Sequence, residues 1–117
     1  MAGFTKRQRE IMAAVRPLLA LPGVTERETK TQLAFAAGVQ FAWLSPAPSG
    51  KGLFVSFGLP APLDSPRAPS VQPYPGRFTH HVTLEGPEGA DGELAGWLKE
   101  AYDFARFRAA RRSPRSR

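Results

Sequence analysis

The 117-residue sequence contains no cysteine, and this absence excludes several kinds of chemistry. Disulfide bonds, thiolate metal sites and thiol nucleophiles all require that residue. Histidine is nearly absent as well, since His80 and His81 are the only two in the chain. A metal site would therefore need carboxylate ligands, and the acidic residues are scattered along the sequence. We predict that the protein holds no metal and no cofactor, and we assign no catalytic residue.

Long hydrophobic runs are also missing. No apolar stretch approaches the roughly 20 residues that a membrane-spanning helix needs. Near the N-terminus, Glu10 and Arg16 interrupt the apolar residues, so this segment lacks the unbroken core of a signal peptide. We expect an amphipathic helix there. We also expect a cytoplasmic protein without membrane association, either a monomer or a small homo-oligomer.

The excess positive charge of the chain is confined to its end. The formal net charge is +6, and six of the 16 lysines and arginines lie in residues 106–117. The remaining basic residues balance the 10 acidic ones, so the rest of the chain is neutral. Such a tail can bind nucleic-acid phosphates weakly, or it can be a solvated end without a partner, which we favour. Its arginines are Arg106, Arg108, Arg111, Arg112, Arg115 and Arg117.

Two segments have the spacing of amphipathic helices. In residues 4–21, apolar side chains recur on one face after Thr5, a candidate N-cap. Pro17 predicts a kink there, or a helix end near Arg16. A second helix is expected from residue 93 to about residue 111, where an acidic start and an arginine-rich end both suit the helix dipole.

Alternation of apolar and polar residues predicts β-strands between the two helices. Residues 25–38 are ambiguous, because Thr25 and Glu28 can form a helix capping box whereas the alternation that follows favours a strand. Residues 60–76 contain six prolines, so we expect an irregular loop there. The strands are expected at residues 29–36, 39–44, 53–59 and 77–85.

These elements predict an α+β fold with an antiparallel four-stranded sheet. The expected element order is α-β-β-β-β-α, with the two helices packed on one face of the sheet. Trp43 and Trp97 fall on apolar stripes and are expected in the core. We expect a single domain over residues 1–105. The arginine-rich tail of residues 106–117 would then contain the end of a helix followed by disorder.

Five short motifs resemble those of a known family. They are TKTQLAF, FAWL, LFVSFGLP, HHVTL and WLKEAYDFA, in this order within residues 26–105. Together they resemble a bacterial domain of unknown function of the YdhG-like type. The resemblance implies a small cytoplasmic α+β domain whose sheet curls toward a half-barrel, and it implies a strand at residues 29–36. It implies no activity, and it does not extend to the tail.

The histidine doublet lies in the stretch FTHHVTL, on the last predicted strand. Because side chains alternate along a strand, His80 should share a face with Phe78, and His81 should share the opposite face with Thr83. In a regular strand the two histidines therefore cannot bind one ligand together. We expect His80 to be a neutral core residue and His81 to lie on a polar face.

The candidate binding site is on the sheet face that points away from the helices. If that face is concave, its cationic side chains suit a small anionic ligand or a protein partner. A solvated sheet surface is the simpler interpretation. The sequence favours a small non-enzymatic binding module, with a nucleic-acid-associated protein and an enzyme using His81 as general base as alternatives. The candidate residues are Lys30, Gln32, Arg67, Arg77 and His81.

Overall fold

In the computed structural model, which describes residues 4–112, the first helix, α1 (Lys6–Val15), begins at a capping box. The Thr5 hydroxyl accepts a hydrogen bond from the Gln8 amide, and the Gln8 side chain accepts one from the Thr5 amide. Gln8 is buried, and its side-chain nitrogen donates to the carbonyls of Ala47 and Gly52. The cap therefore ties α1 to the turn between two strands of the sheet.

Proline ends α1 where the sequence predicts an end. The helix stops at Val15, and the chain continues as a 3-10 turn, Arg16–Leu19, with Pro17 near its start. Proline fits the first turn of a helix because the amide that it lacks has no partner there. A second 3-10 turn, Pro87–Gly89, precedes the last helix, α2 (Gly92–Arg112).

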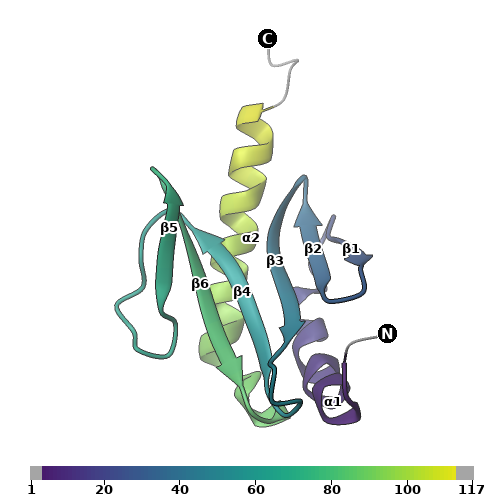
Figure 1. Ribbon diagram of the computed structural model, residues 1–117. Helices are drawn as coiled ribbons and strands as arrows, with labels where there is room; N and C mark the ends of the chain where they lie inside the picture. The colour runs from purple at the N-terminus through teal and green to yellow at the C-terminus, as the bar shows by residue number, and fades with distance from the viewer. Residues whose placement is uncertain (1–3, 113–117) are drawn as a thin grey trace.

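Six antiparallel strands form one sheet in the spatial order β1-β2-β3-β4-β6-β5 (Figure 1). The predicted strands form the middle of the sheet, except that residues 29–32 are a turn and the first of these strands begins at Leu33. β3 and β4 are joined by a short turn, and the last strand along the chain, β6, lies between β4 and β5. The strands are β1 (Thr25–Glu28), β2 (Leu33–Ala37), β3 (Val39–Pro46), β4 (Leu53–Leu59), β5 (Ser70–Tyr74) and β6 (Arg77–Leu84).

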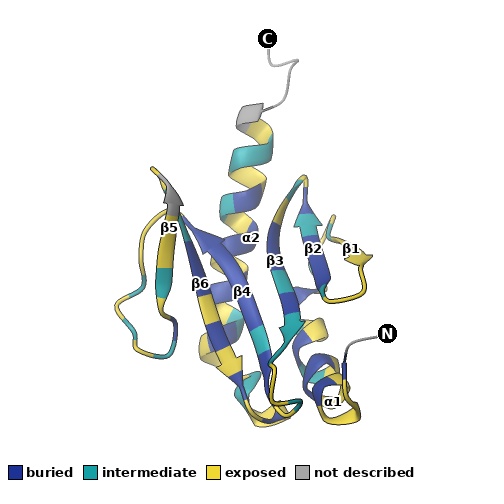
Figure 2. Ribbon diagram, viewed as in Figure 1, coloured by how far each residue is buried: buried dark blue, intermediate teal, exposed yellow. Residues whose placement is uncertain are grey.

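The prediction of a four-stranded sheet is wrong, because the sheet has one further strand at each edge. β1 takes the place of the helix start that its sequence TERE also suggested, and all four of its residues are exposed (Figure 2). β5 lies inside the predicted proline-rich loop. An edge strand tolerates proline, and the β5 pairing shifts between Val71 and Tyr74, the interval that contains Pro73. Neither strand has the alternating pattern by which the inner strands were predicted.

One hydrophobic core lies between the sheet and the two helices, and both helices contribute side chains to it. In Figure 1, α2 passes behind the sheet, and its last turns extend past the ends of the strands. Both helices therefore contribute to the same core. No helix in residues 4–112 is long and apolar enough to cross a membrane.

A β-bulge at Phe41 reverses the alternation of side chains along β3. Ala42 and Gln40 pair with consecutive residues of β2, so Phe41 is the extra residue. Phe41 is buried, and its ring meets that of Tyr102 edge-on with centroids 5.9 Å apart. Beyond the bulge, Trp43 points away from the helices. Regular alternation would have placed it in the core together with Phe41.

α2 crosses the turn between β2 and β3 at very close range. Gly38 in that turn has a φ of +86°, and a Cβ atom there would lie 2.5 Å from the Cβ of Ala109. Only glycine combines this left-handed backbone with the absence of a side chain. The close approach fixes the position of α2 near its C-terminal end, within the part of the chain that we predicted to be a tail.

Candidate functional site

The sheet face that no helix covers contains a hollow of about 390 Å³ over β3, β4 and β6. We call it the sheet hollow. It combines apolar walls with a small number of hydrogen-bonding groups, a mixture that is typical of small-molecule sites. The apolar walls are Trp43, Phe54 and Pro69, and the polar groups include Ser56, His81 and Thr83.

The register of the strands brings these side chains together. Residues directly opposite each other in an antiparallel sheet share a face. Ser56 of β4 pairs with Trp43 of β3 on one side and with His81 of β6 on the other. Phe54 pairs with Thr83 in the next row of the same face. Apart from Pro69, which lies in the loop before β5, the side chains of the sheet hollow therefore come from the middle strands of the sheet.

A hydrogen bond between Ser56 and His81 lies at the centre of the sheet hollow. The Ser56 hydroxyl and His81 Nδ1 are 2.8 Å apart, and the His81 ring meets the Trp43 ring edge-on with centroids 6.4 Å apart. The His81 amide donates to the carbonyl of Pro69, which holds that proline at the rim. Ser56 is buried although it belongs to the open face. These contacts hold the side chains of Ser56 and Trp43 and the backbone of Pro69 around the His81 ring.

The Ser56–His81 pair contains two of the groups that a catalytic serine site uses. Hydrolases activate a serine hydroxyl with a histidine whose other ring nitrogen is oriented by a third group, usually a carboxylate. No acidic residue lines the sheet hollow. With Nδ1 bonded to Ser56, the His81 ring has Nε2 as its remaining polar atom. His81 can therefore offer one hydrogen bond to a ligand beside the Trp43 ring.

Arg77 brings a positive charge to the margin of the sheet hollow. A Cβ atom at Gly58 would lie 2.9 Å from Nε and Nη2 of Arg77, so the guanidinium lies directly over this glycine. Gly58 and Ser56 are two residues apart on β4, which places them about 7 Å apart on one face of the strand. A ligand that fills the sheet hollow can therefore extend a negatively charged group toward Arg77.

Two of the other candidates lie elsewhere. Lys30 and Gln32 belong to the turn between β1 and β2, where the Gln32 carbonyl accepts hydrogen bonds from the amide and hydroxyl of Thr29. β2 and β3 separate that turn from β4, and neither residue lines the sheet hollow. Of the predicted set, His81 therefore lines the sheet hollow and Arg77 lies at its margin over Gly58, whereas Lys30 and Gln32 lie away from it.

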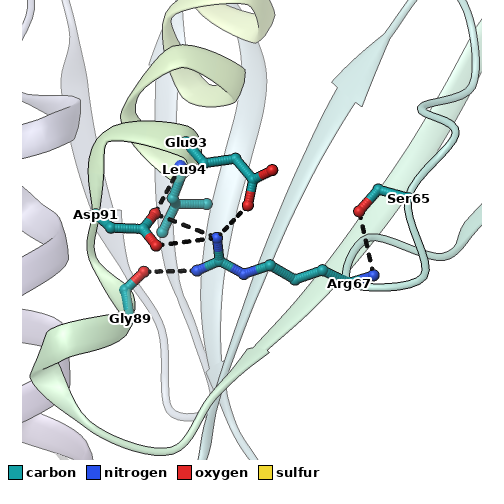
Figure 3. Close-up of polar contacts among 6 residues, drawn as sticks. All are labelled: Ser65, Arg67, Gly89, Asp91, Glu93 and Leu94. Carbon is teal, nitrogen blue, oxygen red and sulfur yellow. Dashed lines mark hydrogen bonds and ion pairs between the residues drawn. The ribbon is translucent and has the colours of Figure 1, made fainter.

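Arg67 lies on the other side of the sheet, where it joins the loop before β5 to the start of α2 (Figure 3). Its Nη1 contacts the carboxylates of Asp91 at 3.2 Å and Glu93 at 2.6 Å, and its Nη2 donates to the Gly89 carbonyl. The guanidinium also lies 5.6 Å from the centroid of the Trp97 ring. The two carboxylates therefore already neutralise the charge of Arg67. We call this set of contacts, which joins the loop to the start of α2, the Arg67 clamp.

The electrostatics of the clamp agree with its geometry. Burial alone would lower the pKa of Arg67, but the hydrogen bonds and charges of Glu93 and Asp91 outweigh it and raise that pKa. The pKa of Asp91 is lowered, chiefly because its carboxylate accepts a hydrogen bond from the Leu94 amide and additionally because it faces Arg67. Asp91 is thus the N-cap of α2 as well as a partner of the clamp.

We expect Arg67→Met to lower the free energy of unfolding by about 1–2 kcal/mol, because two ion pairs, a carbonyl hydrogen bond and an aromatic contact are lost together. Urea unfolding measures the change. Lys99→Met is the matched control, since Lys99 forms an exposed pair with Asp103 one turn away on α2, and it should cost less than about 0.5 kcal/mol. Equal effects of the two variants would contradict the clamp.

His80 faces the core, opposite to His81, as the alternation along β6 predicts. It is fully buried, and its ring stacks on Phe57 with centroids 5.4 Å apart. Its Nε2 accepts a hydrogen bond from the Leu63 amide at 2.9 Å. Burial lowers the pKa of His80, and the nearby backbone groups of Phe78 and Phe57 offset only part of this effect. His80 is therefore a neutral structural residue.

The first arginines of the predicted tail belong to α2. Arg106 donates to the Tyr102 hydroxyl at 2.9 Å, and the Arg108 guanidinium lies 5.5 Å from the centroid of the Phe104 ring. Arg111 and Arg112 fall within the bounds of α2. Arg115 and Arg117 lie outside the described residues, so nucleic-acid binding by residues 106–117 stays a prediction.

Sequence reasoning missed most of the walls of the sheet hollow. Phe54 and Ser56 occupy even positions on a strand whose odd positions are apolar, and this alternation was visible in the sequence. The pairing of Ser56 with His81 was not, because it depends on the register between β4 and β6. Trp43 was assigned to the core, since nothing in the sequence marks the bulge that turns it outward.

Within residues 4–112, no group of three or more histidine, aspartate or glutamate side chains gathers into a potential metal site.

Comparison with protein-family profiles gives a match over most of the chain. The profile of a family described as "Domain of unknown function (DUF5655)" matches residues 4–105. No curated protein and no solved structure matches the chain.

Proposed function

Since the chain belongs to the DUF5655 family of domains of unknown function, we propose from its geometry that it is a non-enzymatic binding module whose site is the sheet hollow. One observation carries the proposal. The Ser56–His81 hydrogen bond lies beside the Trp43 ring, in a hollow on the face that the helices leave open. A polar pair of one buried and one exposed side chain, held next to a partly exposed aromatic ring, provides both orientation and contact area for a ligand.

The size and polarity of the sheet hollow support a small ligand with a flat apolar body. Its volume of about 390 Å³ is near the lower end of the range for small-molecule sites. Trp43, Phe54 and Pro69 supply the apolar contact, and His81 supplies a hydrogen bond. No aspartate, glutamate, lysine or arginine side chain lines the hollow.

Arg77 supports the choice of an anionic group on the ligand. The guanidinium over Gly58 is the nearest cation along β4 to the Ser56–His81 pair among the five candidates. A guanidinium recognises a carboxylate through paired hydrogen bonds and retains its charge at any physiological pH. We therefore propose a small aromatic or planar carboxylate as the ligand class, with its ring at Trp43 and its carboxylate toward Arg77.

A titration with benzoate, followed by the amide NMR signals of the protein, tests this proposal. We expect the signals of residues 43, 56 and 81 to move, with the weak affinity that so small a probe allows. Trp43→Ala should weaken binding about tenfold, equivalent to about 1.4 kcal/mol. Arg77→Met should weaken benzoate binding but leave the binding of uncharged benzamide unchanged.

Lys30→Met is the matched control for Arg77→Met, because it removes a positive charge from the turn between β1 and β2. It should leave benzoate binding unchanged. Shifts confined to other parts of the protein, or equal losses in the two charge variants, would reject the sheet hollow as the site.

Three broader proposals rest on the sequence alone. The motif resemblance supports a bacterial domain of the YdhG-like type, and the composition supports a cytoplasmic location. The basic residues 106–117 support weak, salt-dependent binding to nucleic acid as a separate function. The benzoate experiment does not depend on any of these three.

A further inference from the structure

The outward face of α2 contains a second feature, unrelated to the sheet hollow. A shallow groove of about 380 Å³ is lined by Leu59, Pro60, Glu100, Asp103, Phe104 and Phe107. Phe107 is 57% exposed, and the only other large hydrophobic side chain so exposed in the described residues is Val71 on β5. An exposed phenylalanine at the edge of an apolar groove is typical of an interaction surface.

The charges on this face change sign at the two aromatic residues. Glu100 and Asp103, the latter in an exposed ion pair with Lys99, come before the pair Phe104 and Phe107, and basic residues follow it. The order is symmetric about the midpoint between the two phenylalanines. Asp103 directly precedes the first phenylalanine and Arg108 directly follows the second, while Glu100 and Arg111 each lie three positions further out.

Helix geometry places these positions on one side of α2. Residues that are three or four apart lie next to each other on a helix surface. Positions 100, 103, 104, 107, 108 and 111 follow this spacing, whereas the stripe that contacts the sheet includes Leu98, Ala101 and Ala105. The groove and the charge reversal therefore belong to one surface, which we call the α2 outer face.

We propose that the α2 outer face binds the same face of a second copy of this chain. In a two-fold symmetric pair of oppositely directed helices, the acidic half of each helix lies along the basic half of the other. Phe107 of each copy then packs against the groove beside Phe104 of its partner. The α2 outer face is therefore self-complementary, because its acidic and basic residues and its phenylalanines each meet a suitable partner when two copies face each other.

The architecture leaves room for this pairing. The last turns of α2 extend past the strands, so a second helix can lie along them and meet the end of β4 only where Leu59 and Pro60 line the groove (Figure 1). The contact would span about three helical turns from each copy, which is smaller than the roughly 800 Å² per partner of a standard stable interface. The dimer should therefore be reversible, dependent on protein concentration and weakened by salt.

Sedimentation equilibrium of the full chain tests the proposal through reciprocal charge reversal. One variant carries Glu100→Arg with Asp103→Arg, and the other carries Arg108→Glu with Arg111→Glu. Each variant alone should be monomeric at concentrations where the unmodified protein dimerises, because like charges then face each other. An equimolar mixture of the two should dimerise again, since opposite charges face each other between the two variants.

Phe107→Ala provides a second test that leaves the charges unchanged. It should reduce dimerisation at least about tenfold, equivalent to about 1.4 kcal/mol, whereas Val71→Ala, which truncates the other exposed hydrophobic residue, should have no effect. Circular dichroism confirms that each variant is folded. A wild-type protein that stays monomeric at every concentration, a dimer that survives Phe107→Ala, or a mixture of charge variants that remains monomeric would each overturn the proposal.

Discussion

Gly38→Ala is expected to lower the free energy of unfolding by about 3 kcal/mol, because two separate costs add at this position. The backbone of Gly38 is left-handed, with a φ of +86°, a conformation that disfavours any residue with a Cβ atom. The added methyl group would also lie 2.5 Å from the Cβ of Ala109. That atom is fixed to a helix backbone, so α2 or the turn between β2 and β3 must move.

Gly76→Ala separates the two costs. Gly76 has nearly the same φ, +85°, but nothing lies within 4 Å of the position of its Cβ atom. We expect it to cost about 1 kcal/mol from backbone strain alone. Urea unfolding of both variants measures the difference, which is the cost of the clash with α2. If Gly38→Ala is no more destabilising than Gly76→Ala, α2 does not cross the turn as closely as described.

The stability of the protein is expected to decrease as the pH falls below about 6.5, because His80 is buried and neutral. The pKa of His80 in the folded state lies below its ordinary value of 6.5, chiefly through burial. Below pH 6.5 the unfolded chain therefore binds a proton that the folded protein does not, and protonation favours unfolding. The loss continues down to the folded-state pKa and then levels off. Above pH 6.5 the full stability is retained.

The histidine doublet supplies its own control for this measurement. Between pH 7.5 and pH 5.5, the unmodified protein should lose up to about 1.4 kcal/mol more than His80→Gln, which cannot bind the proton. His81→Gln is the matched substitution on the opposite face of β6, and it should retain the pH dependence that His80 causes because His80 stays in place. An equal pH dependence in all three proteins, measured by urea unfolding, would show that His80 does not titrate as proposed.

The inner part of the fold could be predicted from the sequence, because it follows local patterns. Both helices and the middle strands have periodic apolar residues, which reflect burial on one side. The edge strands lack such a pattern. β1 is held by backbone pairing with β2 while its side chains remain exposed, and β5 lies in a segment whose prolines argue against a strand. Their formation depends on the neighbouring strand rather than on their own composition.

The candidate site could be predicted only where alternation along a single strand was sufficient. Alternation placed His80 and His81 on opposite faces, and it placed Arg77 on the same face as His81. It gave no information about partners on other strands, so Ser56 was not connected with His81. The bulge at Phe41 and the path of the loop that carries Arg67 are tertiary features. They decide that Trp43 belongs to the site and that Arg67 does not.

The two edge strands also carry residues that disfavour the addition of a further strand to the sheet. The outermost strand of any sheet presents unpaired backbone groups to which another chain can add, and such growth leads to aggregates. β1 consists of TERE, so charged side chains cover one margin of the sheet. At the other margin, Pro73 in β5 has no amide hydrogen to offer a further strand. The segments with the least hydrophobic pattern are therefore suited to prevent unwanted self-association through strand pairing.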